Sequence, residues 1–260
     1  IQVSPNNTLN PIKLYKKLKN ELDKISPQLL HAHCPRSLFL MYFLPTKYKK
    51  IYTAHIYPGI QQKALYGTFK GIIVTKLLNF FMNKTEYPIA CSYSVRDQFK
   101  ENQGWEIDAI QNGCSLPVWD RDENERQSLR NKLGFQDNVK YFIFIGRLSK
   151  EKRPDYIVDV FSKMKNLNIG LIVLGDGPLY NKIKNKESDY IKIEGFKTNI
   201  YDYLKASDYY ISPSLVEGLA NTLLESMSVG LPMVLSKIPS HNEVISGSDK
   251  FIGLLFEDSE

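Results

Sequence analysis

The sequence predicts an α/β protein made of two parallel-sheet domains in tandem. Short apolar runs rich in β-branched residues end in Gly or Ser, and stretches with helical periodicity lie between them. Near-continuous apolar strands that alternate with helices are typical of a parallel sheet covered on both faces. The 260 residues, 43% of them hydrophobic, suffice for one large domain or two smaller ones and exclude the disordered and fibrous classes of protein.

The first half of the chain shows this alternation less regularly than the second. Its candidate strands are QLLHAH, KIYTAH, YPIACS and DAIQNG, at residues 28–33, 50–55, 87–92 and 108–113. Its candidate helices lie near 12–25, 60–84 and 94–102.

The second half contains five candidate strands. They are KYFIFIG, IGLIVLG, YIKIEG, YYISPS and PMVLS, at residues 140–146, 169–175, 190–195, 209–214 and 232–236. After the first of them, Pro154 is a favourable first helical residue, and apolar residues recur at helical spacing from Ile157 to Met164. A strand followed by a helix is therefore the repeating unit.

A polar and charged segment at 115–138 favours a domain boundary. We expect an N-terminal domain at 1–115, a linker at 116–138 and a C-terminal domain at 139–260. The chain begins with Ile1 and a helical pattern instead of a strand, and it stops soon after a further apolar run. We therefore expect the first domain to be incomplete at its start and the second to be truncated at its end.

Basic residues are concentrated in the first third of the chain. The net charge is +6, but residues 1–90 alone hold 13 basic and 3 acidic side chains. This asymmetry suggests that the front of the chain faces an anionic partner. In the helix near 12–25, lysines flank an apolar stripe of leucines, which fits a surface helix of the domain or a helix that binds anionic lipid.

The cysteines and the apolar runs bear on the compartment. Cys34, Cys91 and Cys114 lie far apart without a CxxC pair, so we expect neither a disulfide framework nor a zinc site. No apolar run reaches the roughly 18–20 residues of a membrane span, and no signal peptide is evident. We expect a cytoplasmic protein that could also contact the inner face of the membrane.

The strongest candidate site is EGLANTLLE at 217–225, between an expected strand and an expected helix. The pattern favours Asn221 as the N-cap of that helix, with its first turn ending at Glu225. Free N–H groups and a partial positive charge at a helix N-terminus suit a phosphate. The carboxylates of Glu217 and Glu225 can accept hydrogen bonds from sugar or ribose hydroxyls. The alternative is an ordinary helix start beside a solvated loop.

Two further loops follow expected strands. GRLSKEKRP at 146–154 places Arg147, Lys152 and two more basic residues at the carboxyl edge of the sheet, where α/β folds bind ligands. Arg and Lys together suit a diphosphate, although a solvated basic loop is the alternative. GDGP at 175–178 lacks the third glycine of a dinucleotide fingerprint. It fits a tight turn that lets a nucleotide base approach the backbone, and a plain turn is the alternative.

The histidines differ in their expected roles. His31 and His33 alternate along one strand and share a face, but no third ligand follows at metal spacing, so we expect packed, hydrogen-bonded side chains. His55 ends the next strand, at the edge of the sheet where ligands bind. It is the histidine that we expect at the site.

These motifs together resemble the retaining glycosyltransferases of family 4, whose GT-B fold has two Rossmann-like, doubly wound parallel-sheet domains facing each other across a cleft. The similar segments occur in the family's order: LLHAHC, IYTAHIYP, IACSYSVRDQF, IQNGCS, FIFIGRLSKEKRPDYIVDVF, LIVLGDGPLY, IEGF, YYISPSLVEGLANTLLESMSVGLPMV and HNEVI. The resemblance covers essentially the whole chain, is weak in 1–27, and is most specific where two glutamates eight residues apart accompany the GRLSKEK loop.

The resemblance implies an enzyme that transfers a sugar from a nucleotide-diphosphate donor to an acceptor with retention of configuration. The residues it implies for donor binding are Arg147, Lys152, Ala220, Asn221, Thr222 and Glu225. The basic pair would hold the diphosphate with the amides at the helix start, and Glu225 would bind the ribose hydroxyls. The implied catalytic residues are Glu217 and His55, which would contact the donor sugar from the two domains.

The resemblance also implies the partners. We expect a nucleotide sugar, most simply a UDP-sugar, and a glycan or lipid-linked acceptor of cell-surface polysaccharide or glycolipid synthesis, with no nucleic acid. The family usually needs no metal and no other cofactor. DRD at 120–122 matches the Asp-x-Asp pattern of metal-dependent sugar transferases, but it lies in the expected linker and not after a strand.

Two alternatives stay open. One is a nucleotide-sugar epimerase of the same architecture, and the other is a non-catalytic partner subunit that binds a nucleotide sugar. The sequence also lacks the family's first strand, the Gly-rich loop of its first domain and its final helix. We therefore expect a fragment of an active enzyme.

Overall fold

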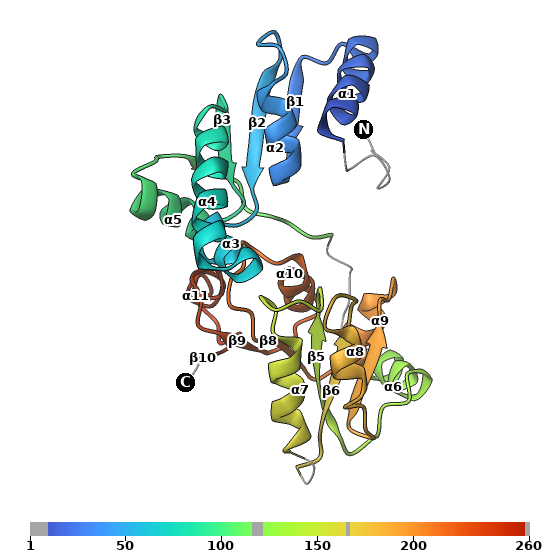
Figure 1. Ribbon diagram of the computed structural model, residues 1–260. Coiled ribbons are helices and arrows are strands. Elements are labelled where there is room, and N and C mark those ends of the chain that lie inside the picture. The colour runs from blue at the N-terminus through green and yellow to red at the C-terminus, as the bar shows by residue number, and fades with distance from the viewer. Residues whose placement is uncertain (1–9, 116–121, 165–166, 258–260) are drawn as a thin grey trace. The chain divides into compact units, whose positions relative to one another are not determined.

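The computed structural model describes residues 10–115, 122–164 and 167–257 (Figure 1). The chain divides into two compact units, Ile1–Ile110 and Gln111–Glu260. The first unit contains a four-stranded sheet and the second a six-stranded sheet, and neighbouring strands in both are parallel. The predicted α/β class with two parallel sheets is confirmed.

The sheet of the first unit has the strand order β1-β2-β3-β4. The elements of this unit are α1 (Pro11–Ile25), β1 (Leu29–Ala32), α2 (Pro35–Tyr42), β2 (Lys49–Ala54), α3 (Pro58–Tyr66), α4 (Thr68–Asn83), β3 (Tyr87–Ala90), α5 (Tyr93–Gln103) and β4 (Asp108–Ala109). All four strands lie within the ranges expected from the sequence, except that β2 begins one residue earlier.

Two features of the first unit differ from those predicted from the sequence. Helix α2 was not anticipated; Pro35 is its first residue, and the Ser37 hydroxyl accepts a hydrogen bond from the Cys34 N–H at 3.1 Å. The helix expected at 60–84 is two helices, α3 and α4, because Gly67 between them has φ +78°. The two helices pack closely at Gly71, where a Cβ would lie 2.6 Å from the Lys63 Cα.

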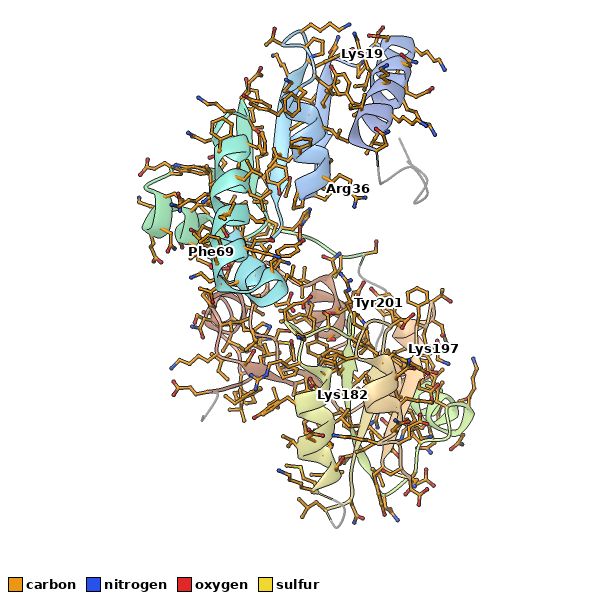
Figure 2. The ribbon with its side chains drawn as sticks, in the orientation of Figure 1. Lys19, Arg36, Phe69, Lys182, Lys197 and Tyr201 are labelled. Carbon is orange, nitrogen blue, oxygen red and sulfur yellow. The ribbon has the colours of Figure 1, made fainter. Side chains whose placement is uncertain are left out.

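Helix α1 is a surface helix of the first unit. The side chains of Leu14 and Leu22 are buried, and Leu22 packs with Leu44 and Tyr48. The lysines of α1 are exposed, among them Lys19, which Figure 2 labels. The apolar stripe that suggested lipid binding is thus largely occupied by contacts within the unit.

The second unit has the strand order β10-β9-β8-β5-β6-β7. Its elements are α6 (Glu123–Lys132), β5 (Lys140–Ile145), α7 (Pro154–Ser162), β6 (Ile169–Leu174), α8 (Tyr180–Lys184), β7 (Ile191–Gly195), α9 (Ile200–Ala206), β8 (Tyr209–Ser212), α10 (Asn221–Ser228), β9 (Met233–Ser236), α11 (Pro239–Ser246) and β10 (Gly253–Phe256). The chain builds β5, β6 and β7 outward in one direction and then returns to place β8, β9 and β10 on the other side of β5. This is the doubly wound topology that the family resemblance implied.

The core of the second unit lies on both faces of its sheet. On one face Ile143 of β5 packs in a cluster with Leu204 of α9 and Leu223 of α10. On the other face Phe144 packs with residues of α7 and α8, such as Val158 and Ile183. Adjacent residues of one strand thus point to opposite clusters, which explains why the strands are near-continuous apolar runs.

The segment at 116–138, expected to be a linker, contains α6 in its described part. Helix α6 packs against the second unit through Arg130, whose side chain is buried. Its guanidinium donates to the carbonyl oxygens of Ala206 at 3.0 Å and Val139 at 2.9 Å and pairs with Asp208 at 3.3 Å. Within the described part of this segment, the polar residues from Glu123 to Lys132 therefore belong to a helix with one buried arginine. The two units divide near residue 110.

Candidate functional site

The reversal of strand order places two predicted loops side by side. Strands β5 and β8 are neighbours in the sheet, with Phe142 paired to Tyr209 and Ile143 to Tyr210. The GRLSKEK loop follows β5, and the EGLANTLLE segment follows β8. A crevice outside the carboxyl ends of the strands, at the point where the order reverses, is where open α/β sheets bind ligands.

A hollow of about 590 Å³ lies at this edge of the second unit. This volume is within the usual range for small-molecule sites. The residues that line it come from the carboxyl ends of β5, β6 and β7, the loops after them, and the starts of α9 and α10: Ile145, Gly146, Arg147, Leu174, Gly175, Asp176, Phe196, Lys197, Thr198, Ile200, Asn221, Thr222 and Glu225. The structure thus brings together four of the predicted donor-binding residues, Arg147, Asn221, Thr222 and Glu225.

The start of α10 differs from the expected cap. The helix begins at Asn221, and Ala220, in an extended conformation, is the N-cap. The Ala220 carbonyl oxygen accepts the first helical bonds, from the N–H groups of Leu223 at 3.1 Å and Leu224 at 3.3 Å. No side chain among the described residues caps this terminus. The prediction of Asn221 as the N-cap was therefore wrong by one residue, and a small, uncapped helix start lies at the hollow.

Lys152 and Glu217, which were given separate roles, form an ion pair. The Lys152 ammonium donates to Oε1 of Glu217, and the two side chains are only 23% and 9% exposed. A charge pair largely shielded from water holds both side chains in place, because separating them would leave each charge poorly solvated. The pair joins the GRLSKEK loop to the EGLANTLLE segment.

Tyr210 of β8 lies near the carboxylates of Glu217 and Glu225. Its phenol is buried and shares a hydrogen bond of 3.1 Å with the Thr222 hydroxyl. Burial raises the pKa of Tyr210, and the charges of Glu217 and Glu225 raise it further, although the Thr222 hydrogen bond opposes them. The neutral phenol therefore supports the first turn of α10 between the two glutamates.

Glu225 occupies a partly buried position at the hollow. Burial raises the pKa of its carboxyl above the ordinary glutamate value. Cys114 and Tyr201 lie near Glu225. Burial raises the pKa of the Cys114 thiol and of the Tyr201 phenol, and the Glu225 charge raises both further. The Tyr201 hydroxyl (Figure 2) donates to the Ser115 carbonyl oxygen at 2.9 Å. Cys114 and Tyr201 were not among the predicted site residues, although the family-like segment IQNGCS contains Cys114.

The GDGP turn packs directly against the backbone of the GRLSKEK loop. Gly175 has φ +136°, and a Cβ there would overlap the Gly146 carbonyl oxygen. The Leu148 N–H donates to the Asp176 carbonyl oxygen, and the Leu179 N–H donates to the Leu148 carbonyl oxygen, both at 2.9 Å. The expected tight turn is present, and its glycines allow two loops to meet backbone to backbone beside Arg147.

Phe196, Lys197 and Thr198 complete the hollow after β7 and were not predicted as site residues. Phe196 is 75% exposed, so its ring is accessible at the hollow. Lys197 (Figure 2) pairs with Glu194 at 3.0 Å. Their position directly after an expected strand of the same sheet is the sequence signal that could have identified them as site residues.

His55 belongs to the first unit, where it follows β2. Its Nε2 lies 3.0 Å from Nδ1 of His33, while Nε2 of His31 lies 2.7 Å from the Thr53 hydroxyl. Burial first, and then the neighbouring imidazoles, lower the pKa of His31 and His55. His31 and His33 are hydrogen-bonded as expected, but they are exposed and not packed in the core.

Two negative findings concern the described residues. They contain no group of three or more His, Cys, Asp or Glu side chains arranged to hold a metal ion. Of the DRD motif, Asp120 and Arg121 lie outside the described residues, and Asp122 caps α6 by accepting from the Asn124 N–H at 2.8 Å. None of the described helices has the length and hydropathy needed to cross a bilayer.

Comparison with known proteins gives two matching family models. The model described as Glycosyl transferases group 1 matches residues 125–260, which is more than half of the chain. The model described as Glycosyltransferase Family 4 matches residues 2–116. The two matches follow the two units in order.

Curated relatives match over much of the chain. It is 28% identical over 246 residues to the alpha-monoglucosyldiacylglycerol synthase of Streptococcus pneumoniae, covering 88% of this chain and 55% of the relative. It is 28% identical over 201 residues to the UDP-Gal:alpha-D-GlcNAc-diphosphoundecaprenol alpha-1,3-galactosyltransferase of Escherichia coli, covering 71% of this chain and 51% of that protein. The chain thus spans about half the length of these curated relatives.

Solved structures share the fold. Anabaena Alr3699/HepE in complex with UDP-glucose matches with a TM-score of 0.81 and 19% identity, over 99% of this chain and 71% of that one. WaaG, a glycosyltransferase involved in lipopolysaccharide biosynthesis, matches with a TM-score of 0.73 and 15% identity, over 99% of this chain and 72% of that one. These similarities confirm the predicted GT-B fold class.

Proposed function

Because the chain belongs to the group 1 glycosyl transferases, we propose that it forms part of an enzyme that transfers a sugar from a nucleotide-diphosphate donor to an acceptor with retention of configuration. The observation that carries this proposal is the hollow at the strand reversal, where Arg147, the start of α10 and Glu225 meet. A cation, free amides and a carboxylate acceptor within one hollow match the diphosphate and ribose of a nucleotide.

The diphosphate binds between Arg147 and the N-terminus of α10 in this proposal. The amides at Ala220, Asn221 and Thr222 lack a side-chain cap within the described residues, so they are free to donate to phosphate oxygens. Lys152 donates to the diphosphate while it keeps its contact with Glu217, because an ammonium group has three N–H donors. Fixed cations at a leaving diphosphate stabilise its developing charge without a metal ion, so we propose no metal and no cofactor.

Glu217 of the second unit and His55 of the first unit are the residues that contact the donor sugar in this proposal. The Lys152 contact fixes one carboxylate oxygen of Glu217, and the other can accept from a sugar hydroxyl. His33 fixes the ring of His55 through the bond at 3.0 Å, so that the second ring nitrogen of His55 is available to the sugar. The site orients the sugar at the carbon where the bond to the diphosphate breaks.

The relatives support a UDP-sugar donor and an acceptor carried by a lipid or a glycan. One structural neighbour was solved with UDP-glucose, and the names of two curated relatives specify a glucosyldiacylglycerol and a diphosphoundecaprenol-linked sugar. We propose that the protein acts in the synthesis of a cell-surface polysaccharide or glycolipid, on the cytoplasmic side of a membrane whose anionic surface it contacts peripherally.

Titration calorimetry with UDP, GDP and ADP tests the donor site. We expect one of them, most simply UDP, to bind in the presence of EDTA, because the proposed phosphate and ribose contacts need no metal. Arg147→Ala should weaken that binding about tenfold or more, the scale of a lost charge-assisted hydrogen bond. Lys150→Ala is the matched control, since Lys150 is exposed in the same loop and does not line the hollow. Binding that needs Mg²⁺ or Mn²⁺, or equal effects of the two substitutions, would contradict the proposal.

The pH dependence of UDP binding tests Glu225 separately. Burial raises the pKa of this carboxyl, so its ionised form is lost at a higher pH than that of an exposed glutamate as the pH falls. Since the ionised form is the better acceptor for ribose hydroxyls, affinity should fall as the pH drops through the raised pKa. The Glu225→Gln variant should bind more weakly at neutral pH and lack this step. The titration of UDP itself affects the unchanged protein and the Glu225→Gln variant equally, so the difference between their affinities at each pH reports on Glu225. If the two affinities changed with pH in parallel, Glu225 would not bind the ribose as proposed.

A further inference from the structure

The first unit carries an exposed apolar surface that the proposed site does not use. It lies on the helical hairpin α3–α4 and is called the hairpin face. Its side chains, all at least 48% exposed, are Leu65, Tyr66, Phe69, Ile73, Leu77 and Phe80. Soluble proteins rarely expose a contiguous group of large apolar side chains of this kind unless it binds something.

The residues of α4 in the hairpin face form one stripe. Phe69, Ile73, Leu77 and Phe80 follow at intervals of four, four and three residues, so they lie on the same side of the helix. The stripe is about 16 Å long at the usual rise per residue. Phe69, at the start of α4 (Figure 2), is 78% exposed. At the other end the Phe80 ring meets Tyr42 of α2 at 6.0 Å between centroids, so the apolar surface continues onto α2.

The charge around the hairpin face has a single sign. Residues 24–85 contain nine Lys or Arg and no Asp or Glu. Lys63, Lys70, Lys76 and Lys84 on and beside the hairpin are exposed, and none of them forms an ion pair among the described residues. A basic rim around exposed aromatic and aliphatic side chains is complementary to an anionic lipid surface, where apolar groups enter the headgroup boundary and lysines meet phosphates.

We propose that the hairpin face is the surface by which this protein docks on an anionic bilayer. Tyr66 and Phe69, on either side of Gly67, enter the headgroup region, where aromatic side chains are favoured. Helix α1 contributes charge only, since its leucine stripe is largely buried within the unit. This inference rests on the proposed function for its purpose, which is to bring a lipid-linked acceptor to the enzyme.

A second copy of the chain is a poorer occupant of the same surface. Two hairpin faces brought together would oppose lysines to lysines without an acidic side chain between 24 and 85 to compensate them. Like charges brought into one interface disfavour association. An anionic surface instead removes this repulsion, because each lysine gains a counter-charge.

Vesicle co-sedimentation without nucleotide tests the proposal. The protein should bind vesicles of phosphatidylcholine with phosphatidylglycerol far better than vesicles of phosphatidylcholine alone, and added salt should weaken that binding. Phe69→Glu should reduce it about tenfold or more, given the free energy of burying a phenylalanine. The matched control is Phe251→Glu in the second unit, because Phe251 is also 78% exposed, and it should bind as the unchanged protein does.

Further variants separate the two contributions. Lys70→Glu with Lys76→Glu should remove the preference for anionic vesicles, and Phe69→Ala should weaken binding to both kinds of vesicle. Equal effects of Phe69→Glu and Phe251→Glu, or equal binding to neutral and anionic vesicles, would overturn the proposal. So would light scattering that shows a dimer disrupted by Phe69→Glu while vesicle binding is unchanged.

The experiments distinguish failure of the membrane-docking proposal from failure of the proposed donor site. Phe69→Glu should retain the UDP affinity of the unchanged protein, which also shows that the variant is folded. Vesicle binding without any nucleotide binding would count against the donor site alone. Nucleotide binding without vesicle binding would count against the hairpin face alone.

Discussion

Glu217→Gln should lower the kcat of sugar transfer by about a hundredfold or more, the usual scale for removing one preorganised electrostatic group. Glutamine keeps the shape of the side chain and removes its charge. In the proposed site this charge lies beside the carbon whose bond to the diphosphate breaks, so its effect is larger in the transition state than in the bound substrate. Such a loss reduces turnover and leaves the donor KM nearly unchanged. Initial rates at saturating acceptor, with the donor varied, measure both quantities.

Two variants act as controls for Glu217. Glu225→Gln should raise the donor KM and spare kcat, because a ribose contact is the same before and during reaction. Lys152→Ala should change both constants, since the diphosphate is bound throughout and gains charge as it leaves. It also leaves Glu217, only 9% exposed, without its cation. Normal turnover by Glu217→Gln together with inactive Glu225→Gln would reverse the two roles, and unaffected transfer by both would move the site elsewhere.

Gly175→Ala should destabilise the second unit by about 3 kcal/mol or more, the scale of a residue forced into overlap and backbone strain. At φ +136° a side chain is strained, and its Cβ would overlap the Gly146 carbonyl oxygen. Relief requires that the GDGP turn and the GRLSKEK loop separate, which would also displace Arg147. Denaturant unfolding of the variant should show an earlier transition, and calorimetry should show weaker UDP binding.

Gly113→Ala is the matched control for this prediction. A Cβ at Gly113 would meet no atom within 4 Å, and its φ lies outside the left-handed region. We expect the unfolding midpoint of this variant to stay close to that of the unchanged protein. If Gly175→Ala unfolds at the same midpoint, the two loops adjust without cost and the close backbone approach does not hold the site together.

The strands could be predicted because they are long apolar runs between turn residues. The central strands β5 and β6 of the second unit are buried on both faces, and their apolar pattern does not depend on which strands lie beside them. The helices were harder to predict from the sequence than the strands. Helix α2 is short, and its start depends on a local bond between Cys34 and Ser37. Residues 60–84 were expected to form one helix, and only the positive φ of Gly67 shows where α3 and α4 separate.

The segment at 116–138 and the N-cap of α10 could not be predicted correctly from the sequence, for a different reason. The polar residues of α6 suggested a solvated segment, because the burial of Arg130 depends on carbonyl groups from distant parts of the chain. The predicted cap of α10 was one residue too late, because asparagine is a favoured N-cap residue and alanine is not. In the structure Ala220 has the extended backbone of the cap, and the Thr222 hydroxyl bonds to Tyr210.

The sequence by itself determined the fold class, the order of the strands along the chain and the two loops that carry the candidate donor site. These depend on residue type and spacing, which are local properties. Only the tertiary structure decided that β8 lies beside β5, so that Arg147 and Glu225 line one hollow, and that Lys152 pairs with Glu217. It also decided that the stripe of α1 is covered while that of α4 is exposed. The reason is physical: which apolar stripe is buried and which charges meet depend on strand order and packing, and spacing along the chain does not specify them.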